Sequence, residues 1–138
     1  MHQPNIISAG KMMAYVLTLF GIMQCGATFA PYFQEGIAGL EPELFRNMLF
    51  YSFMCGGVLI ISGVLLTVMF GKAAKSPDFG SPILILGTFV AIYGILSVAF
   101  MYRNPFSWMI AILCLAIFID ALCLKLSIDQ NKKEKAAK

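Results

Sequence analysis

The chain has 138 residues, of which 59% are hydrophobic and only 12% are charged, and its formal net charge is +3. A soluble domain carries about a quarter charged residues, so this composition excludes an ordinary soluble globular protein. The small positive excess is better explained by membrane topology than by nucleic-acid binding.

Four long apolar segments, separated by polar loops, account for most of the chain. A helix needs about 20 apolar residues to cross a hydrocarbon core of about 30 Å. None of the segments has the alternating polarity of a membrane β-barrel, and backbone groups in lipid must be paired within each segment. The sequence therefore predicts an all-α polytopic membrane protein, an antiparallel bundle of four transmembrane helices. We expect one domain, 1–138, with helices at about 11–30, 44–70, 82–102 and 105–126 and a basic cytoplasmic tail, 127–138.

The first loop is the longest, and its last part, EPELFR, has the pattern of a helix start. Proline is favoured in the first turn of a helix, and acidic residues are favoured near its positive end. The rest of this loop is either a simple connector or a short interfacial helix over the outer face. The third loop, YRNPF, is short enough to force the third and fourth helices into a hairpin.

The basic residues predict the orientation of the bundle. With both termini inside, every lysine lies on the cytoplasmic side, and only Arg46 and Arg103 lie outside. Because Lys and Arg are enriched in cytoplasmic loops, we expect an N-in, C-in topology. The lipid bilayer is then the first partner of the chain.

Small residues recur at helical spacing in the apolar segments. The series include Gly56 and Gly63 in the second segment and Gly87, Ala91 and Gly94 in the third. In lipid, close approach through small residues replaces the hydrophobic drive that packs soluble helices. These stripes predict packing within one bundle, and they leave homo-oligomerisation open.

One acidic residue, Asp120, interrupts the fourth apolar segment. Its expected depth is about 10 Å from the cytoplasmic end, and a carboxylate inside the membrane costs about 2–3 kcal/mol on insertion scales. Tyr15, Ser62 or Thr67, and Thr88 are expected at similar depth and can donate hydrogen bonds. The group is either a structural polar network or a proton or cation site, and both interpretations stay open.

A second set of polar side chains is expected nearer the outer face. It comprises Gln24, Tyr51, Ser52 and Ser97, with Thr28 beside them. We interpret it as hydrogen bonding within the bundle, at about 0.6 kcal/mol per contact.

The sequence offers little material for a cofactor or a catalytic site. The only histidine is His2, outside the apolar segments, which disfavours haem and the usual zinc ligand sets. The four cysteines form no C-x-x-C pair and are interpreted as small packing residues. With one terminal histidine, no Ser-His-Asp set can be drawn. We therefore expect no cofactor, no metal and no catalytic residues.

Several residues spread over the chain carry a resemblance to a known group: Pro31, Arg46, Gly56, Gly57, Gly87, Gly94 and Arg103. Together with the long first loop, their order resembles the small four-helix membrane proteins of the DoxX-like group. That resemblance implies a protein of the bacterial inner membrane, sometimes an accessory to redox systems. Small multidrug transporters also have four helices, but the working glutamate of their first helix has no counterpart here.

Three functions are therefore weighed, in this order. The first is an accessory or structural membrane protein without catalytic activity, which acts as a partner in a larger membrane complex. The second is a small oligomeric transporter or channel that uses Asp120 as a proton or cation site. The third is a membrane enzyme acting on lipid or quinone, for which the chain lacks an evident acid-base or nucleophilic pair.

Overall fold

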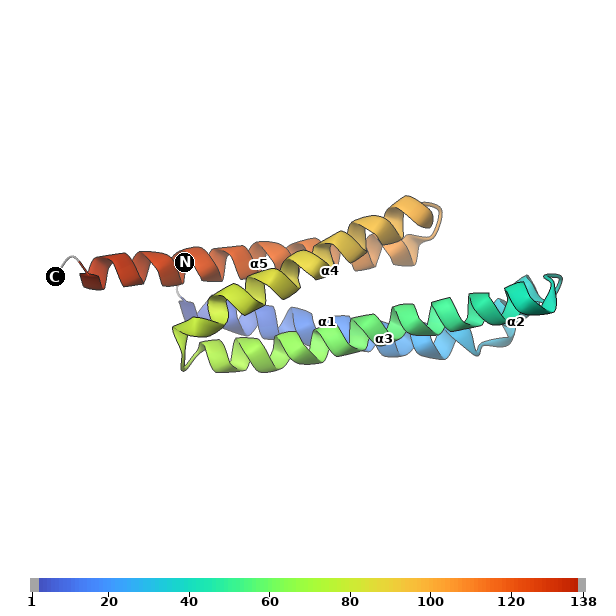
Figure 1. The fold of residues 1–138 in the computed structure, drawn as a ribbon, viewed down its shortest axis with the longest axis horizontal. Coiled ribbons are helices and arrows are strands. Elements are labelled where there is room, and N and C mark those ends of the chain that lie inside the picture. The colour runs from blue at the N-terminus through green and yellow to red at the C-terminus, as the bar shows by residue number, and fades with distance from the viewer. Residues whose placement is uncertain (1–2, 137–138) are drawn as a thin grey trace.

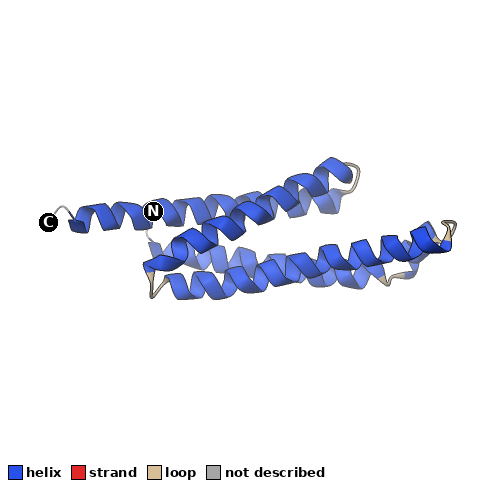
Figure 2. Ribbon diagram, viewed as in Figure 1, coloured by secondary structure: helices blue, strands red, loops and turns tan. Residues whose placement is uncertain are grey.

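The computed structural model describes residues 3–136, and these residues form helices joined by short turns, without a strand (Figures 1 and 2). The elements in order are α1 (Gln3–Thr28), α2 (Pro31–Ile37), α3 (Pro42–Ala73), the 3-10 turn η1 (Pro77–Phe79), α4 (Gly80–Phe100) and α5 (Pro105–Ala136). Four of these helices, α1, α3, α4 with its preceding turn, and α5, are long and apolar enough to cross a membrane. The prediction of an all-helical chain with four candidate membrane spans is confirmed.

α1 starts earlier, α3 is longer at both ends and α5 ends later than expected, whereas α4 is shifted by two residues from the expected 82–102. Proline stands at the start of α2, α3 and α5, where its missing N–H costs no hydrogen bond. At the other end, α5 continues through the basic tail to Ala136, because Lys, Glu, Gln and Ala are strong helix formers. An ion pair one helical turn apart, Lys125 with Asp129 at 2.8 Å, supports this extension. In the first loop, the short helix α2 has no buried residue.

The four long helices associate mainly as two pairs. α1 packs most extensively against α3, and α4 packs against α5, whereas the α1–α5 contact is smaller and the α3–α4 contact smaller still. Figure 1 shows α4 starting beside the end of α3 and meeting the start of α5 at the opposite end of the molecule. The α1–α5 contact is therefore the main connection between the two pairs.

Buried residues follow a repeat of 3.5 positions along each long helix. On α3 they include Gly56, Leu59, Gly63, Leu66, Phe70 and Ala73, and on α5 they are Ser107, Ile110, Cys114, Ile117, Ala121, Leu124 and Ile128 (with Ala111 beside them). On α1 they include Ile7, Gly10, Ala14, Leu17 and Gly21, and on α4 Gly80, Ile83, Gly87, Val90 and Gly94. This is the heptad pattern of left-handed helix packing, and on α4 glycine occupies one of its two core positions throughout.

Glycines bring α1 and α3 into backbone contact. A Cβ atom at Gly21 would lie 2.7 Å from the carbonyl oxygen of Gly56, and one at Gly56 would lie 2.8 Å from that of Gly21 and 2.5 Å from the sulfur of Cys25. Gly63 meets Ala14 and Thr18 in the same way. Since a side chain cannot occupy these positions without moving a helix, the small residues determine how closely the pair packs.

Glycines also allow close packing between α4 and α5, at regular intervals along the contact. Gly80, Gly87 and Gly94 follow one another at seven-residue steps and lie against Ile128, Ala121 and Cys114, which follow one another at the same steps. A Cβ atom at Gly94 would lie 2.8 Å from the Cβ of Cys114. A seven-residue repeat keeps the same face of each helix toward its partner over the whole contact.

Two adjacent glycines of α3 test this packing. Gly56→Ala should lower the free energy of unfolding by about 1–3 kcal/mol, because its methyl group meets backbone and sulfur at van der Waals overlap. Gly57→Ala is the matched control, since nothing lies within 4 Å of its Cβ position. It should be neutral or stabilising by up to about 1 kcal/mol, as alanine favours the helix. Thermal unfolding in detergent measures both variants, and equal effects would contradict the close backbone contact between α1 and α3 at Gly56.

Candidate functional site

The carboxyl group of Asp120 points from α5 toward α1 and α3. Its Oδ2 atom is buried and has no hydrogen-bond partner among the described residues. A Cβ atom at Gly10 of α1 would lie 2.5 Å from this oxygen and 2.5 Å from the ring of Phe70 on α3. Gly10 therefore leaves the space that the carboxyl group and the phenyl ring share.

The neighbours of Asp120 show its position along the bundle. Gly10 precedes Lys11 in the sequence, and Phe70 is followed after one residue by Lys72. Measured against α1 and α3, the carboxyl group thus lies where their apolar segments end. On α5 itself the next lysine comes five residues later, which is why α5 alone suggests a deeper position.

The structure does not join the other predicted inner residues to Asp120 by hydrogen bonds. Tyr15 is an exposed side chain on α1, and Ser62 is buried on α3. The hydroxyl of Thr88 donates to the carbonyl of Leu84 at 2.8 Å, within its own helix. Such bonds to the preceding turn satisfy a hydroxyl without a partner from another helix.

Thr67 makes the same kind of bond, to the carbonyl of Gly63 at 2.9 Å. These two threonines are thus satisfied within their own helices, whereas the side chain of Asp120 approaches Gly10 of α1 and Phe70 of α3.

In the predicted outer group, two members are joined across α1 and α3. The amide of Gln24 donates to the hydroxyl of Ser52 at 3.3 Å, and the same hydroxyl lies 2.8 Å from that of Thr28. Thr28 is fully buried and also donates to the carbonyl of Gln24 at 3.0 Å. Together these three residues form a polar clamp near the end of α1, and we call it the Gln24–Thr28–Ser52 clamp.

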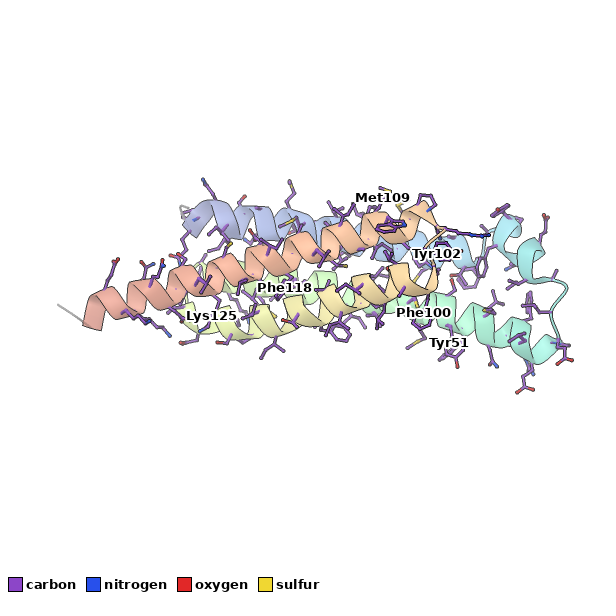
Figure 3. All side chains as sticks on the ribbon, turned by 90° about the horizontal axis from the view of Figure 1, so that it is seen from above. Tyr51, Phe100, Tyr102, Met109, Phe118 and Lys125 are labelled. Atoms are coloured by element: carbon purple, nitrogen blue, oxygen red, sulfur yellow. The ribbon has the colours of Figure 1, made fainter. Side chains whose placement is uncertain are left out.

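The other two members lie apart from this clamp. Tyr51 is exposed on α3, as Figure 3 shows, and its ring packs against Phe50. Ser97 belongs to the α4–α5 pair, where its hydroxyl donates to the carbonyl of Gly94 at 2.8 Å and approaches that of Ser107 at 3.5 Å. The outer polar residues thus serve two different helix contacts.

Two polar contacts were missed by reasoning from the sequence. The phenol of Tyr93 on α4 donates to the carbonyl of Cys55 on α3 at 3.4 Å. The indole of Trp108 donates to the carbonyl of Tyr102 at 2.9 Å, while Arg103 lies over the ring of Tyr102. The first has no local sequence signal, since it depends on how two helices cross. The second follows from the short turn before α5.

The cysteines are free thiols on three helices, and Cys114 is fully buried against Gly94. Within residues 3–136, no cluster of three or more His, Cys, Asp or Glu side chains is arranged to hold a metal ion. The single histidine, His2, lies outside the described residues.

Four candidate transmembrane helices, with apolar side chains exposed along all of them, indicate an integral membrane protein of the α-helical class. Comparison of the chain with models of protein families, with curated proteins and with solved structures finds no match. The resemblance to the DoxX-like group therefore stays a prediction.

Replacing Asp120 by leucine tests whether its carboxyl group is unpartnered in the folded protein. Leucine has the same branched shape, and the carboxyl oxygen has no partner to lose. Asp120→Leu should therefore raise the free energy of unfolding by about 1–3 kcal/mol, the usual cost of an unpaired buried polar group. Chemical or thermal unfolding in a non-ionic detergent measures the change.

Asp129→Leu is the matched control on the same helix. Its carboxylate pairs with Lys125 at 2.8 Å, so its loss should change the free energy of unfolding by no more than about 0.5 kcal/mol, and not upward. A marked loss of stability in Asp120→Leu would mean that the carboxyl group holds a water, an ion or another ligand in the folded protein.

Proposed function

We propose that this protein is an accessory or structural subunit of a membrane complex, with its four helices crossing the bilayer in alternating directions and both termini in the cytoplasm. The pairing of residues supports the alternating directions, because Gly10 lies against Phe70 whereas Gln24 bonds to Ser52. The distribution of lysines supports the orientation. The DoxX-like resemblance supports a bacterial inner membrane as the location.

The single observation that carries the accessory function is how the interior of the bundle is used. Apart from Phe70, the buried stripes consist mainly of small and aliphatic side chains in close contact, and the clamp uses its polar groups to join α1 to α3. An interior of this kind holds helices together. The exposed apolar side chains on all four helices are the surface available to lipid or to a partner subunit.

The accessory function predicts that the protein is recovered from its native membrane as part of a larger assembly. After gentle solubilisation, the chain should migrate on native gels well above its own mass of 15.2 kDa plus detergent. Denaturing the same sample should release the single chain, which controls for aggregation. Migration as a single chain or as a homo-oligomer alone would contradict this function.

The orientation predicts a labelling pattern for single cysteines in a variant whose four native cysteines are replaced. A cysteine at Gly39, in the turn between α2 and α3, should react with a membrane-impermeant thiol reagent applied from outside. A cysteine at Lys75, after the end of α3, should react only once the membrane is opened. Both positions are exposed in the structure, so their reactivity reports sidedness. The reverse pattern would refute the N-in, C-in orientation.

A second candidate, a small oligomeric transporter or channel, is favoured by one observation. The buried Oδ2 atom of Asp120 has no partner among residues 3–136, which is what a proton or cation site without its ligand would look like. The variant Asp120→Asn distinguishes the two functions. An accessory subunit should still assemble into its complex with this substitution. A transporter loses ion-coupled flux in reconstituted vesicles while the protein stays folded.

A further inference from the structure

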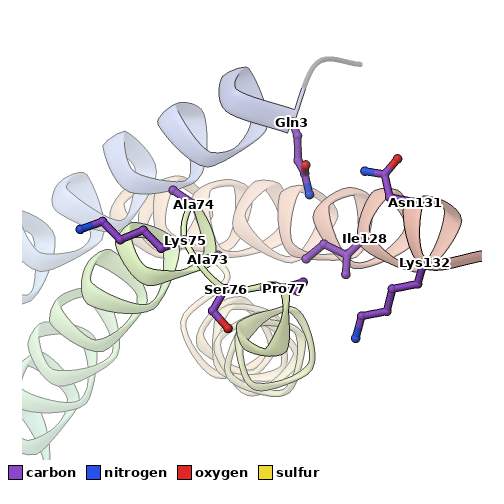
Figure 4. Close-up of a pocket in the computed structure, with 9 residues that line it drawn as sticks. All are labelled: Gln3, Ala73, Ala74, Lys75, Ser76, Pro77, Ile128, Asn131 and Lys132. Carbon is purple, nitrogen blue, oxygen red and sulfur yellow. The ribbon is translucent and has the colours of Figure 1, made fainter. Parts of the chain in front are cut away.

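Two neighbouring pockets lie where α1 begins and α3 ends. One has a volume of about 220 Å³ and extends from Gln3 and the end of α3 to α5, as Figure 4 shows. The other has a volume of about 360 Å³ and lies between the first three turns of α1 and the end of α3. Gln3, Ala73 and Ala74 line both, so the two pockets form one hollow, which we call the inner-end hollow.

Small residues create the inner-end hollow. Ala73 and Ala74 leave room at the end of α3, and Ile7 and Ile128 add apolar wall from α1 and α5. The chain turns back at Ser76 and Pro77, which close the hollow toward η1. A ligand here would thus meet an apolar wall on the bundle side and polar groups at the helix ends.

The side chains that line the hollow have one sign of charge. Lys11, Lys75 and Lys132 line it together with four neutral polar residues, Gln3, Ser8, Ser76 and Asn131, and no aspartate or glutamate of the described chain belongs to either lining. Lys11 and Lys75 have no carboxylate within ion-pair distance among the described residues. Asp78, just outside the lining, lies 3.9 Å from Lys132 and accepts a hydrogen bond from Ser76 at 3.3 Å.

The lysines lie at the rim of the hollow rather than in its centre. Figure 4 shows Lys75 and Lys132 at opposite sides with Gln3 between them, and the ammonium group of Lys75 points away from the hollow. Each lysine carries its ammonium group on a flexible four-carbon chain, so the group can turn toward an anion that enters the hollow. Lys11 extends toward α3, where its Nζ lies 3.5 Å from the Cβ position of Gly71.

We propose that the inner-end hollow binds the phosphate group of an anionic phospholipid at the cytoplasmic leaflet. Two lysines without a carboxylate partner, Lys11 and Lys75, and the neutral polar side chains beside them match a phosphate with a polar headgroup, and basic pockets between membrane helices bind such headgroups. The depth of the hollow also fits a lipid headgroup, since Lys11 lies at the end of the apolar segment of α1. The leaflet rests on the orientation proposed above, whereas the choice of ligand rests on the hollow itself.

The test uses the full chain in a non-ionic detergent, where sidedness plays no part. Phosphatidylglycerol should raise the midpoint of thermal unfolding and stay bound in native mass spectrometry, whereas phosphatidylcholine and inorganic phosphate should do neither. In Lys11→Gln/Lys75→Gln the apparent affinity for phosphatidylglycerol should fall about 25-fold, as each lysine contributes roughly a fivefold factor.

Two control variants distinguish binding in the hollow from a general effect of the protein's positive charge. Arg46→Gln/Lys133→Gln removes the same charge from exposed residues outside both linings and should keep the native affinity. Ala74→Phe keeps every charge but fills the space that both pockets share, and it should weaken binding as the lysine variant does. Each variant must unfold cooperatively without lipid for its affinity to count.

Three results would overturn the proposal. Equal stabilisation by phosphatidylcholine would mean that the headgroup charge is not recognised. Equal stabilisation by inorganic phosphate would assign the hollow to a free anion instead of a lipid. Equal losses in the two charge variants would show a general electrostatic effect. A failed orientation, in contrast, would appear in the labelling of positions 39 and 75 and would leave these affinities unchanged.

Discussion

The close contact of helix backbones at glycines is the constraint on which the rest of this structure depends. Lipid tails are as apolar as the side chains of the helices, so apolar surface alone gives the helices no reason to associate. Contact has to come from packing and from a few hydrogen bonds. At Gly21 and Gly56 the two backbones approach until each carbonyl faces the other glycine. The Gln24–Thr28–Ser52 clamp then joins the same two helices beyond the last glycine contact.

The same constraint explains the position of the one carboxyl group within the bundle. Gly10 belongs to the buried repeat of α1, and its missing side chain opens a space that Asp120 fills from α5. A glycine used for packing in one helix pair has thus become the contact point of another. The accessory and transport functions place different requirements on the space at Gly10. An accessory subunit needs this space filled, whereas a transporter needs an ion to reach it.

The sequence predicts the class of fold because that prediction depends on composition and on the lengths of apolar runs. It also predicts the start of α3 at Pro42, since that signal is local. The start of α1 at Gln3 and the continuation of α5 to Ala136 were not predicted. α5 continues past its apolar segment because good helix formers follow. Small residues were found in the right helices, but only the structure shows that Gly80, Gly87 and Gly94 each lie against a residue of α5.

In the candidate site, too, local features were predicted from the sequence, whereas contacts that depend on helix packing were not. Gln24 and Ser52 are joined as expected for polar residues at one depth, whereas Thr88 and Thr67 bond to their own helices. Depth along a helix can be counted from the sequence, but the direction in which a side chain points depends on how the helices are rotated. The partners of Asp120, a glycine and a phenylalanine, have no polar signal that a search for hydrogen-bond donors would find.

The division into two helix pairs has a consequence for the order of events during synthesis. The α1–α3 contact is complete once Ala73 has been made, and the α4–α5 contact lies wholly within the residues that follow. Each hairpin can therefore form in the membrane as a unit, the first while the second is still being translated. The α1–α5 interface closes last, and Asp120 lies in it. Its carboxyl group thus reaches Gly10 only when the two hairpins dock against each other.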